Sequence, residues 1–183
     1  MSALRLVPTS YILLHMHISK IVSGGQTGAD RGGWEAAIYC SLPYGGWIPL
    51  GRKSEDGVIP TKYKGLQETG SADYLARTES NVVDSEATII FAYGDITGGS
   101  LKTAEFSQKH RRPCLAVDLN EPRGQTVQKI VEWLNGISKP AKGFLNVAGS
   151  RASTSPDIER AVTARMVDVI SGINGRLFYP IQE

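Results

Sequence analysis

The chain has 183 residues, of which 41% are hydrophobic and 21% are charged, and its formal net charge is +2. These values are typical of a single globular domain that is large enough to bury a sizeable core. The small net charge, without a long basic run, excludes a protein that binds nucleic acid by charge alone. The apolar segment at residues 11–14 is far too short to span a membrane. We therefore expect neither nucleic acid nor a membrane as a partner.

The first residues and the two cysteines bear on the domain organisation. Met16 lies directly before the first apolar run, so we expect residues 1–15 to be an extension that is not native or is disordered. Residues 16–183 are expected to form a single Rossmann-like ligand-binding domain. Cys40 and Cys114 lie far apart and in no metal-binding pattern. They indicate reduced structural thiols and a cytoplasmic location, and no metal site is expected.

Apolar runs alternate with segments of helical periodicity along the chain. The runs predict five strands, at residues 18–23, 43–48, 87–93, 113–119 and 144–148. The periodic segments predict helices at residues 29–40, 73–86, 101–110 and 126–134, and a last one from about 155 to 170. Ser155 is expected as the N-cap of that last helix, with Pro156 at its first position. The polar segment 49–71 is longer than an ordinary loop, which favours a functional role.

Strands that alternate with helices predict a three-layer, doubly wound parallel sheet of the Rossmann-like class. Right-handed crossovers that start from a central strand favour the strand order 2-1-3-4-5. In that order the first and third strands are neighbours, and the chain leaves them toward opposite faces of the sheet. The crevice beyond their carboxyl ends is where such sheets bind ligands. The loop at residues 149–154 is expected to open on the same edge.

A glycine-rich turn follows the first strand. Glycines let a ligand approach the backbone closely, and the free N–H groups of a helix start favour an anion. The candidate binding residues here are Gly24, Gly25, Gln26, Thr27, Gly28, Asp30 and Arg31. Two roles stay open for Asp30, as an acceptor for the ligand or as a partner of the helix dipole. A bulky side chain in place of Gly25 is expected to block the ligand and to leave the core intact.

A second glycine-rich turn follows the third strand and offers Thr97, Gly98, Gly99, Ser100 and Thr103 as further binding residues. Neither turn contains the Gly-Lys-Ser/Thr of a P-loop. Neither contains Gly-x-Gly-x-x-Gly, so a nicotinamide dinucleotide is not favoured. The pair of turns predicts a site for a phosphate or another oxyanion. The plain alternative is two tight turns that bind nothing.

Further candidates for pairing with an anion lie between the second and third strands, at Arg52, Lys53 and Arg77. Signals for catalysis are weak. The three histidines suggest no Ser-His-Asp set, and several carboxylates near the expected crevice compete for the role of a general base. The pattern therefore favours a binding protein over an enzyme.

A series of motifs, in one order along the chain, resembles the molybdenum cofactor carrier protein family. The first is Ser-Gly-Gly-Gln-Thr-Gly-Ala-Asp-Arg at residues 23–31. The series continues at residues 45–49, 51–57, 68–69, 77–82 and 97–100, and the resemblance covers roughly residues 18–170. One departure is Ile48, where many relatives have a cysteine, so no thiol contact with a ligand is expected there.

The resemblance implies a Rossmann-like fold, a homo-oligomer, and binding of molybdenum cofactor without turnover. This cofactor is a pterin with a phosphate and a molybdenum–oxo centre. It would be the cargo of the protein, and a molybdoenzyme would receive it. Its anionic groups would lie on the two glycine turns, with Arg31, Arg52, Lys53 and Arg77 as charge partners.

Two other functions stay open. The family is similar to a wider lysine-decarboxylase-like group with nucleoside-monophosphate phosphoribohydrolases, in which a Pro-Gly-Gly-x-Gly-Thr-x-x-Glu turn holds phosphate and supplies a catalytic Glu. Residues 97–105 lie over that pattern, with Thr97 in place of Pro, and Glu105 is retained. One alternative is therefore an N-glycosidic hydrolase that uses Glu105. The other is a nucleotide-sensing module that recruits another protein.

Overall fold

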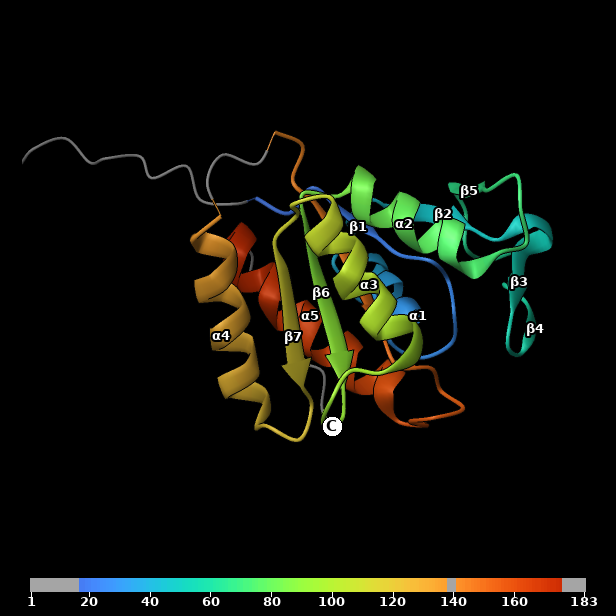
Figure 1. The fold of residues 1–183 in the computed structure, drawn as a ribbon. Coiled ribbons are helices and arrows are strands. Elements are labelled where there is room, and N and C mark those ends of the chain that lie inside the picture. Colours follow the sequence, from blue (N-terminus) through green and yellow to red (C-terminus); the bar gives the residue numbers. More distant parts are fainter. Residues whose placement is uncertain (1–16, 138–140, 176–183) are drawn as a thin grey trace, which may run out of the picture.

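The computed structural model describes residues 17–137 and 141–175 (Figure 1). The expected extension at residues 1–15 lies outside these ranges. Within them, six parallel strands form the main sheet. In spatial order they are β5 (Leu66–Glu68), β2 (Tyr44–Ile48), β1 (Lys20–Val22), β8 (Phe144–Gly149), β6 (Ala87–Ala92) and β7 (Cys114–Asp118).

The expected α/β fold with a parallel sheet is confirmed, but the predicted strand order is wrong in two respects. β8, the fifth predicted strand, lies between β1 and β6, so the first and third predicted strands are not neighbours. β5 adds a sixth strand beside β2, inside the segment that was expected to be a loop. None of the three residues of β5 is buried. No hydrophobic pattern therefore marks it in the sequence.

Helices cover both faces of the sheet (Figure 1). On one face, α5 (Ile158–Asn174) packs against α1 (Ala29–Tyr39) and α4 (Arg123–Asn135). On the other face, α2 (Tyr74–Asp84) packs against α3 (Gly98–Lys109). The chain leaves β6 through α3 and leaves β8 through α5, which lie on opposite faces. The topological switch point, where a ligand is expected, therefore lies between β6 and β8.

The core lies mainly between the sheet and the layer of α1, α4 and α5. All six residues of β6 are buried, as in a central strand of a parallel sheet. By contrast, the residues that α3 buries are Ser100, Thr103 and Ser107. Three helix starts differ from the prediction. α3 begins at Gly98 and α4 at Arg123, each three residues earlier than expected. α5 begins only at Ile158, with Asp157 and not Ser155 as its N-cap, because residues 151–155 form backbone turns of their own.

The long polar segment folds back on itself. After the short helix η1 (Leu50–Arg52), β3 (Lys53–Ser54) and β4 (Gly57–Val58) pair as an antiparallel hairpin. Glu55 and Asp56 are the two residues of its turn. The hairpin lies at the end of the molecule opposite α4 (Figure 1).

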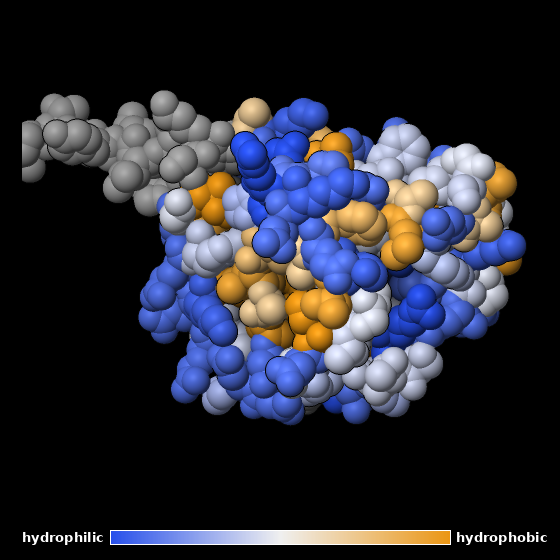
Figure 2. All heavy atoms as spheres, in the orientation of Figure 1, coloured by the Kyte–Doolittle hydropathy of each residue, from blue (hydrophilic) through white to orange (hydrophobic). Residues whose placement is uncertain are grey.

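The edge strand β7 is only partly covered. Figure 2 shows apolar side chains at the surface in the area of β7, between α3 and α4. Ala116 of β7 is exposed, and Leu101 at the start of α3 is 45% exposed. In the ranges that the structure describes, no helix has the length and apolar character needed to cross a membrane.

Gly46 in β2 gives a test of the fold. Its φ is +133°, and a Cβ there would lie 2.2 Å from the carbonyl oxygen of Ser23. Gly46→Ala is therefore expected to lower the free energy of unfolding by roughly 2–4 kcal/mol, because β1 and β2 would have to separate. The control is Gly124→Ala in α4, where a Cβ would meet no atom within 4 Å. It should be neutral or stabilise the protein by up to about 1 kcal/mol. Urea unfolding followed by circular dichroism compares the two, and equal stability would contradict the account.

Candidate functional site

A small cavity lies at the carboxyl edge of the sheet, at the switch point between β6 and β8. Its volume is about 70 Å³. The first glycine turn, the starts of α2 and α3, and the end of β8 bound it. Ala148 and Gly149 at the end of β8 lie among its lining residues. The two glycine turns therefore meet at one cavity even though β8 separates the strands that precede them.

The cavity brings together residues of both turns and one predicted cation. Of the predicted binding residues, those that line it are Gly24, Gln26, Asp30, Arg77, Gly99, Ser100 and Thr103. Those that do not line it are Gly25, Thr27, Gly28, Arg31, Arg52, Lys53, Thr97 and Gly98.

Asp30 joins the first turn to Arg77. Its Oδ2 accepts a hydrogen bond from the backbone N–H of Gln26 (3.2 Å) and pairs with Arg77 Nη1 (2.9 Å). The side chains of Arg77 and Asp30 are only 12% and 6% exposed. Arg77 lies across Gly24, where a Cβ would be 1.3 Å from Arg77 Nη1. Glycine at this position therefore leaves the space that the guanidinium occupies.

Two donors of cavity-lining side chains have no hydrogen-bond partner among the described residues. These are Gln26 Nε2 and Arg77 Nε. Gln26 is 4% exposed, and its Oε1 accepts a hydrogen bond from the backbone N–H of Glu55 (3.0 Å). A buried donor without an acceptor costs about 1–3 kcal/mol. Acceptor oxygens of a ligand would remove that cost.

The start of α3 adds further N–H groups at this edge. Its N-cap, Thr97, makes no side-chain capping hydrogen bond, whereas Asp73 caps α2 by accepting from the N–H of Leu75 (2.9 Å). A Cβ at Gly99 would meet no atom within 4 Å. The backbone at the start of α3 is thus open, and its N–H groups and dipole favour an anion.

Arg151 and Tyr74 are among the lining residues that the sequence prediction missed. The guanidinium of Arg151 lies 5.4 Å from the centre of the Tyr74 ring, and that of Arg77 lies 5.9 Å from it. Both cations therefore lie near the same ring at the cavity. The sequence signal for Arg151 was its loop, which was expected at this edge. No local pattern singled out Tyr74.

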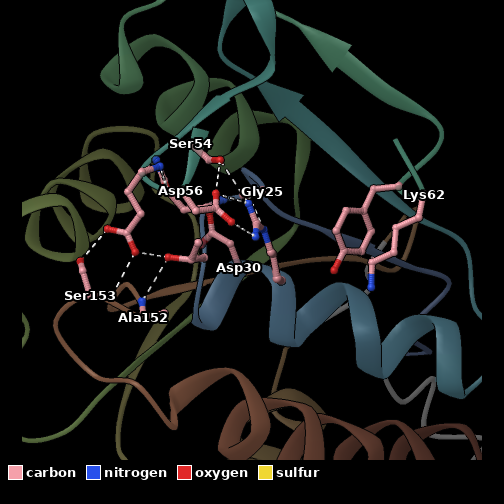
Figure 3. Close-up of polar contacts among 12 residues, drawn as sticks. Gly25, Asp30, Ser54, Asp56, Lys62, Ala152 and Ser153 are labelled. Atoms are coloured by element: carbon pink, nitrogen blue, oxygen red, sulfur yellow. Dashed lines mark hydrogen bonds and ion pairs between the residues drawn. The ribbon is translucent and has the colours of Figure 1, made fainter. Parts of the chain in front are cut away.

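Of the other predicted cations, Arg31 and Arg52 bind parts of the protein. Arg31 pairs with Asp56 in the turn of the hairpin, through Nη1 (2.6 Å) and Nη2 (2.8 Å), and donates to Ser54 Oγ (3.1 Å; Figure 3). Arg52 donates to the carbonyl groups of the segment that follows the hairpin, at Ile59 (3.1 Å), Pro60 (3.1 Å) and Tyr63 (3.2 Å). Lys53 is exposed on β3. Arg31 and Arg52 thus hold the hairpin and the segment after it in place.

The expectation that a bulky residue at Gly25 would spare the core is wrong. A Cβ there would lie 2.6 Å from Trp34 Cη2 and 2.8 Å from Ile59 Cδ1. Trp34 and Ile59 are fully buried core residues. A substitution at Gly25 would therefore disturb packing, and it cannot report on ligand entry alone.

Glu105 lies away from the cavity. It pairs with Lys102 (2.7 Å), and both side chains are 49% exposed. Among the described residues that line the cavity, Asp30 is the single carboxylate, and it is paired with Arg77.

The pair of Arg31 with Asp56 predicts an acid-dependent loss of stability. The hydrogen bond from Arg31 lowers the pKa of Asp56 from 3.8 to about 2. A lowered pKa in the folded state stabilises the protein above pH 3.8, and this contribution is lost as the pH falls from about 4 to 2. Because the Asp56 side chain is 45% exposed, Asp56→Asn should cost only about 1 kcal/mol at pH 7. Urea unfolding at pH 7 and pH 2.5 tests this, and an undiminished difference at pH 2.5 would contradict it.

Comparisons with known proteins identify the family. The family model described as "Circularly permutated YpsA SLOG family" matches residues 21–170. A crystal structure named "Putative molybdenum carrier protein", from Syntrophus aciditrophicus SB, is similar to this chain at 40% sequence identity and a TM-score of 0.78, over 85% of this chain and 96% of that one. No curated protein sequence matches significantly. The chain, with its parallel sheet and its cavity at the carboxyl edge, therefore belongs to the circularly permuted YpsA SLOG family.

Proposed function

We propose that this protein binds molybdenum cofactor and carries it unchanged, and that the cavity holds an oxyanionic group of that cofactor. The observation that carries the proposal is the pair of buried donors Gln26 Nε2 and Arg77 Nε, which have no acceptor among the described residues and belong to side chains that line the cavity. The name of the similar crystal structure supports a molybdenum cargo. The resemblance of the sequence motifs supports the cofactor as the form in which molybdenum is bound.

The charges and donors suit an oxyanion. Asp30 neutralises Arg77, which leaves Arg151 as a further cation at the cavity. The open start of α3 and the hydroxyl of Ser100 add donors to those of Gln26 and Arg77. Hydrogen bonds to charged oxygens are stronger than those between neutral groups. A phosphate or molybdenum–oxo group would therefore be held by directed N–H and O–H donors.

The size of the cavity limits what it can enclose. Its volume of about 70 Å³ is far below the roughly 300–1,000 Å³ of sites that bury a whole drug-sized ligand. In the proposal, one oxyanionic group enters the cavity and the pterin lies outside it. The rim there offers the Tyr74 ring and Leu75, which is 44% exposed.

The positions of the carboxylates favour carriage of the cofactor over its chemical conversion. The carboxylate in the cavity, Asp30, is held in an ion pair, and Glu105 lies away from the cavity on the exposed face of α3. A general base must reach the reacting group directly or through one water. The proposal therefore assigns no catalytic residue. The alternative, an N-glycosidic hydrolase that uses Glu105, is tested below with a Glu105 variant.

We also propose a cytoplasmic homo-oligomer that delivers its cargo to a molybdoenzyme. The partly covered edge strand β7, with apolar side chains at the surface around it, is a surface through which copies could associate (Figure 2). An edge strand presents unpaired N–H and C=O groups with which another chain can pair, which supports a partner at this edge.

The direct test is to purify the protein from cells that make molybdenum cofactor. Molybdenum is measured by mass spectrometry and the pterin by fluorescence after oxidation. The proposal predicts both in equal amounts, and longer survival of added cofactor in air. Absence of both, together with no protection of added cofactor, would contradict it.

Gln26→Glu is the sharpest variant for this test. It keeps the shape of the side chain and an acceptor for the N–H of Glu55, but it replaces the free donor by a negatively charged oxygen. We expect bound cofactor to fall at least tenfold, which corresponds to about 1.4 kcal/mol. Glu105→Gln is the control and should bind normally. Release of free base from AMP that disappears in Glu105→Gln would instead support the hydrolase.

A further inference from the structure

We propose that Glu55, in the turn of the β3–β4 hairpin, is a positioning residue that sets the anion affinity of the cavity. It does so by fixing the amide of Gln26 and by tying the first glycine turn to the loop that carries Arg151. The inference rests on the proposed function, because it assumes that the cavity binds an oxyanion. Glu55 itself does not line the cavity.

The carboxylate of Glu55 bridges two segments that both contribute to the cavity. Its Oε1 accepts from the hydroxyl of Thr27 and from the N–H of Ser153 (3.1 Å), and its Oε2 accepts from Ser153 Oγ (2.6 Å; Figure 3). Thr27 Oγ1 in turn accepts from the N–H of Ala152 (3.2 Å). Thr27 belongs to the first turn, and Ala152 and Ser153 directly follow Arg151. The carboxylate therefore fixes the position of Arg151 relative to the first turn.

The backbone of Glu55 fixes the direction of the Gln26 amide. Its N–H donates to Gln26 Oε1 at 3.0 Å. An N–H group requires an acceptor, and within an amide the oxygen is the acceptor. The amide nitrogen of Gln26 therefore points away from the hairpin, and it is the buried donor that has no partner among the described residues. Without Glu55 in this place, the Gln26 amide could turn over and present its oxygen, which an anion would repel.

Glu55 remains charged under neutral conditions. Burial raises its pKa, but the hydrogen bonds from Ser153 and Thr27 and the charge of Arg151 outweigh burial and leave the pKa below its ordinary value. A residue that is largely exposed gains little from packing. Its several hydrogen bonds, rather than burial, hold it in the bridge.

The neighbouring residue Asp56 provides a matched control. It lies in the same two-residue turn but faces Arg31, which does not line the cavity. If the hairpin served only as a structural anchor, loosening it through Asp56 would weaken anion binding as much as loosening it through Glu55. If Glu55 positions Gln26 and Arg151, its variants should have the larger effect.

The test measures binding of sodium molybdate, sodium phosphate and isolated molybdenum cofactor by calorimetry, with amide hydrogen exchange of the unliganded protein. For the ligands that the wild-type protein binds, we expect Glu55→Ala to weaken affinity at least tenfold. Glu55→Gln keeps one acceptor oxygen, so its affinity should lie between those of the wild-type protein and Glu55→Ala. Asp56→Asn should change the affinity less than threefold. Exchange should rise in residues 24–30 and 148–153 of Glu55→Ala. In a protein that already carries Gln26→Met, Glu55→Ala should cause a smaller loss of affinity than it causes in the wild-type protein. A purely structural role of Glu55 would instead give additive losses of affinity.

The contradicting outcomes are distinct. Three outcomes would overturn the inference and leave the proposed function standing. Glu55→Ala could bind with wild-type affinity, or Glu55→Ala and Asp56→Asn could lose affinity equally. The third is that the losses of affinity from Glu55→Ala and Gln26→Met are additive. A wild-type protein that binds none of the three ligands would overturn the proposed function, and with it the role of Glu55 in binding. Unchanged exchange in both segments would refute the bridge itself, whatever ligand is bound.

Discussion

The ion pair between Arg77 and Asp30 is the contact on which the site depends. It joins α2 to the start of α1 across Gly24, where a side chain would displace the guanidinium of Arg77, and the same carboxylate oxygen accepts from the N–H of Gln26. Because Asp30 neutralises Arg77, attraction for an anion depends on Arg151, on the start of α3 and on donors with fixed directions. Desolvated hydrogen bonds of this kind are specific in geometry. In the proposed function, the small net charge of the site lets the protein hold its cargo and still release it.

The class of the fold could be predicted from the sequence, because the buried run of β6 and the amphipathic stripe of α5 leave clear periodic patterns. The strand order could not, because a pattern does not say which neighbour a strand pairs with. The permutation named in the family description explains the error. If the strands are numbered from β6, then β6, β7, β8, β1, β2 and β5 become 1 to 6, and the sheet reads 2-1-3-4-5-6. The expected winding is present, but this chain begins within it, so the switch point lies at β6 and β8.

The candidate site could be predicted in part, for a related reason. Glycine turns after parallel strands place N–H donors at the carboxyl edge, and Gln26, Gly99 and Ser100 were found in this way. In the sequence, Arg31 and Arg77 have the same expected role, as cations that pair with an anion. Only tertiary contacts show that their roles differ, since Arg31 pairs with Asp56 and Arg77 lines the cavity. Glu55 leaves no local signal of its role, and Arg151 is indicated only by the expected place of its loop. Their roles arise where a hairpin, a turn and a distant loop meet, and such meetings depend on the folded chain.

The central claim is that the donors of this cavity hold an oxyanion. A crystal structure of the protein with bound molybdate, located by its anomalous scattering, tests this claim most directly. The account predicts a peak in the cavity within hydrogen-bond distance of Gln26 Nε2, beside the start of α3, with the pair of Arg77 and Asp30 intact. An empty cavity, with molybdate bound instead at exposed cations such as Lys53, would contradict it.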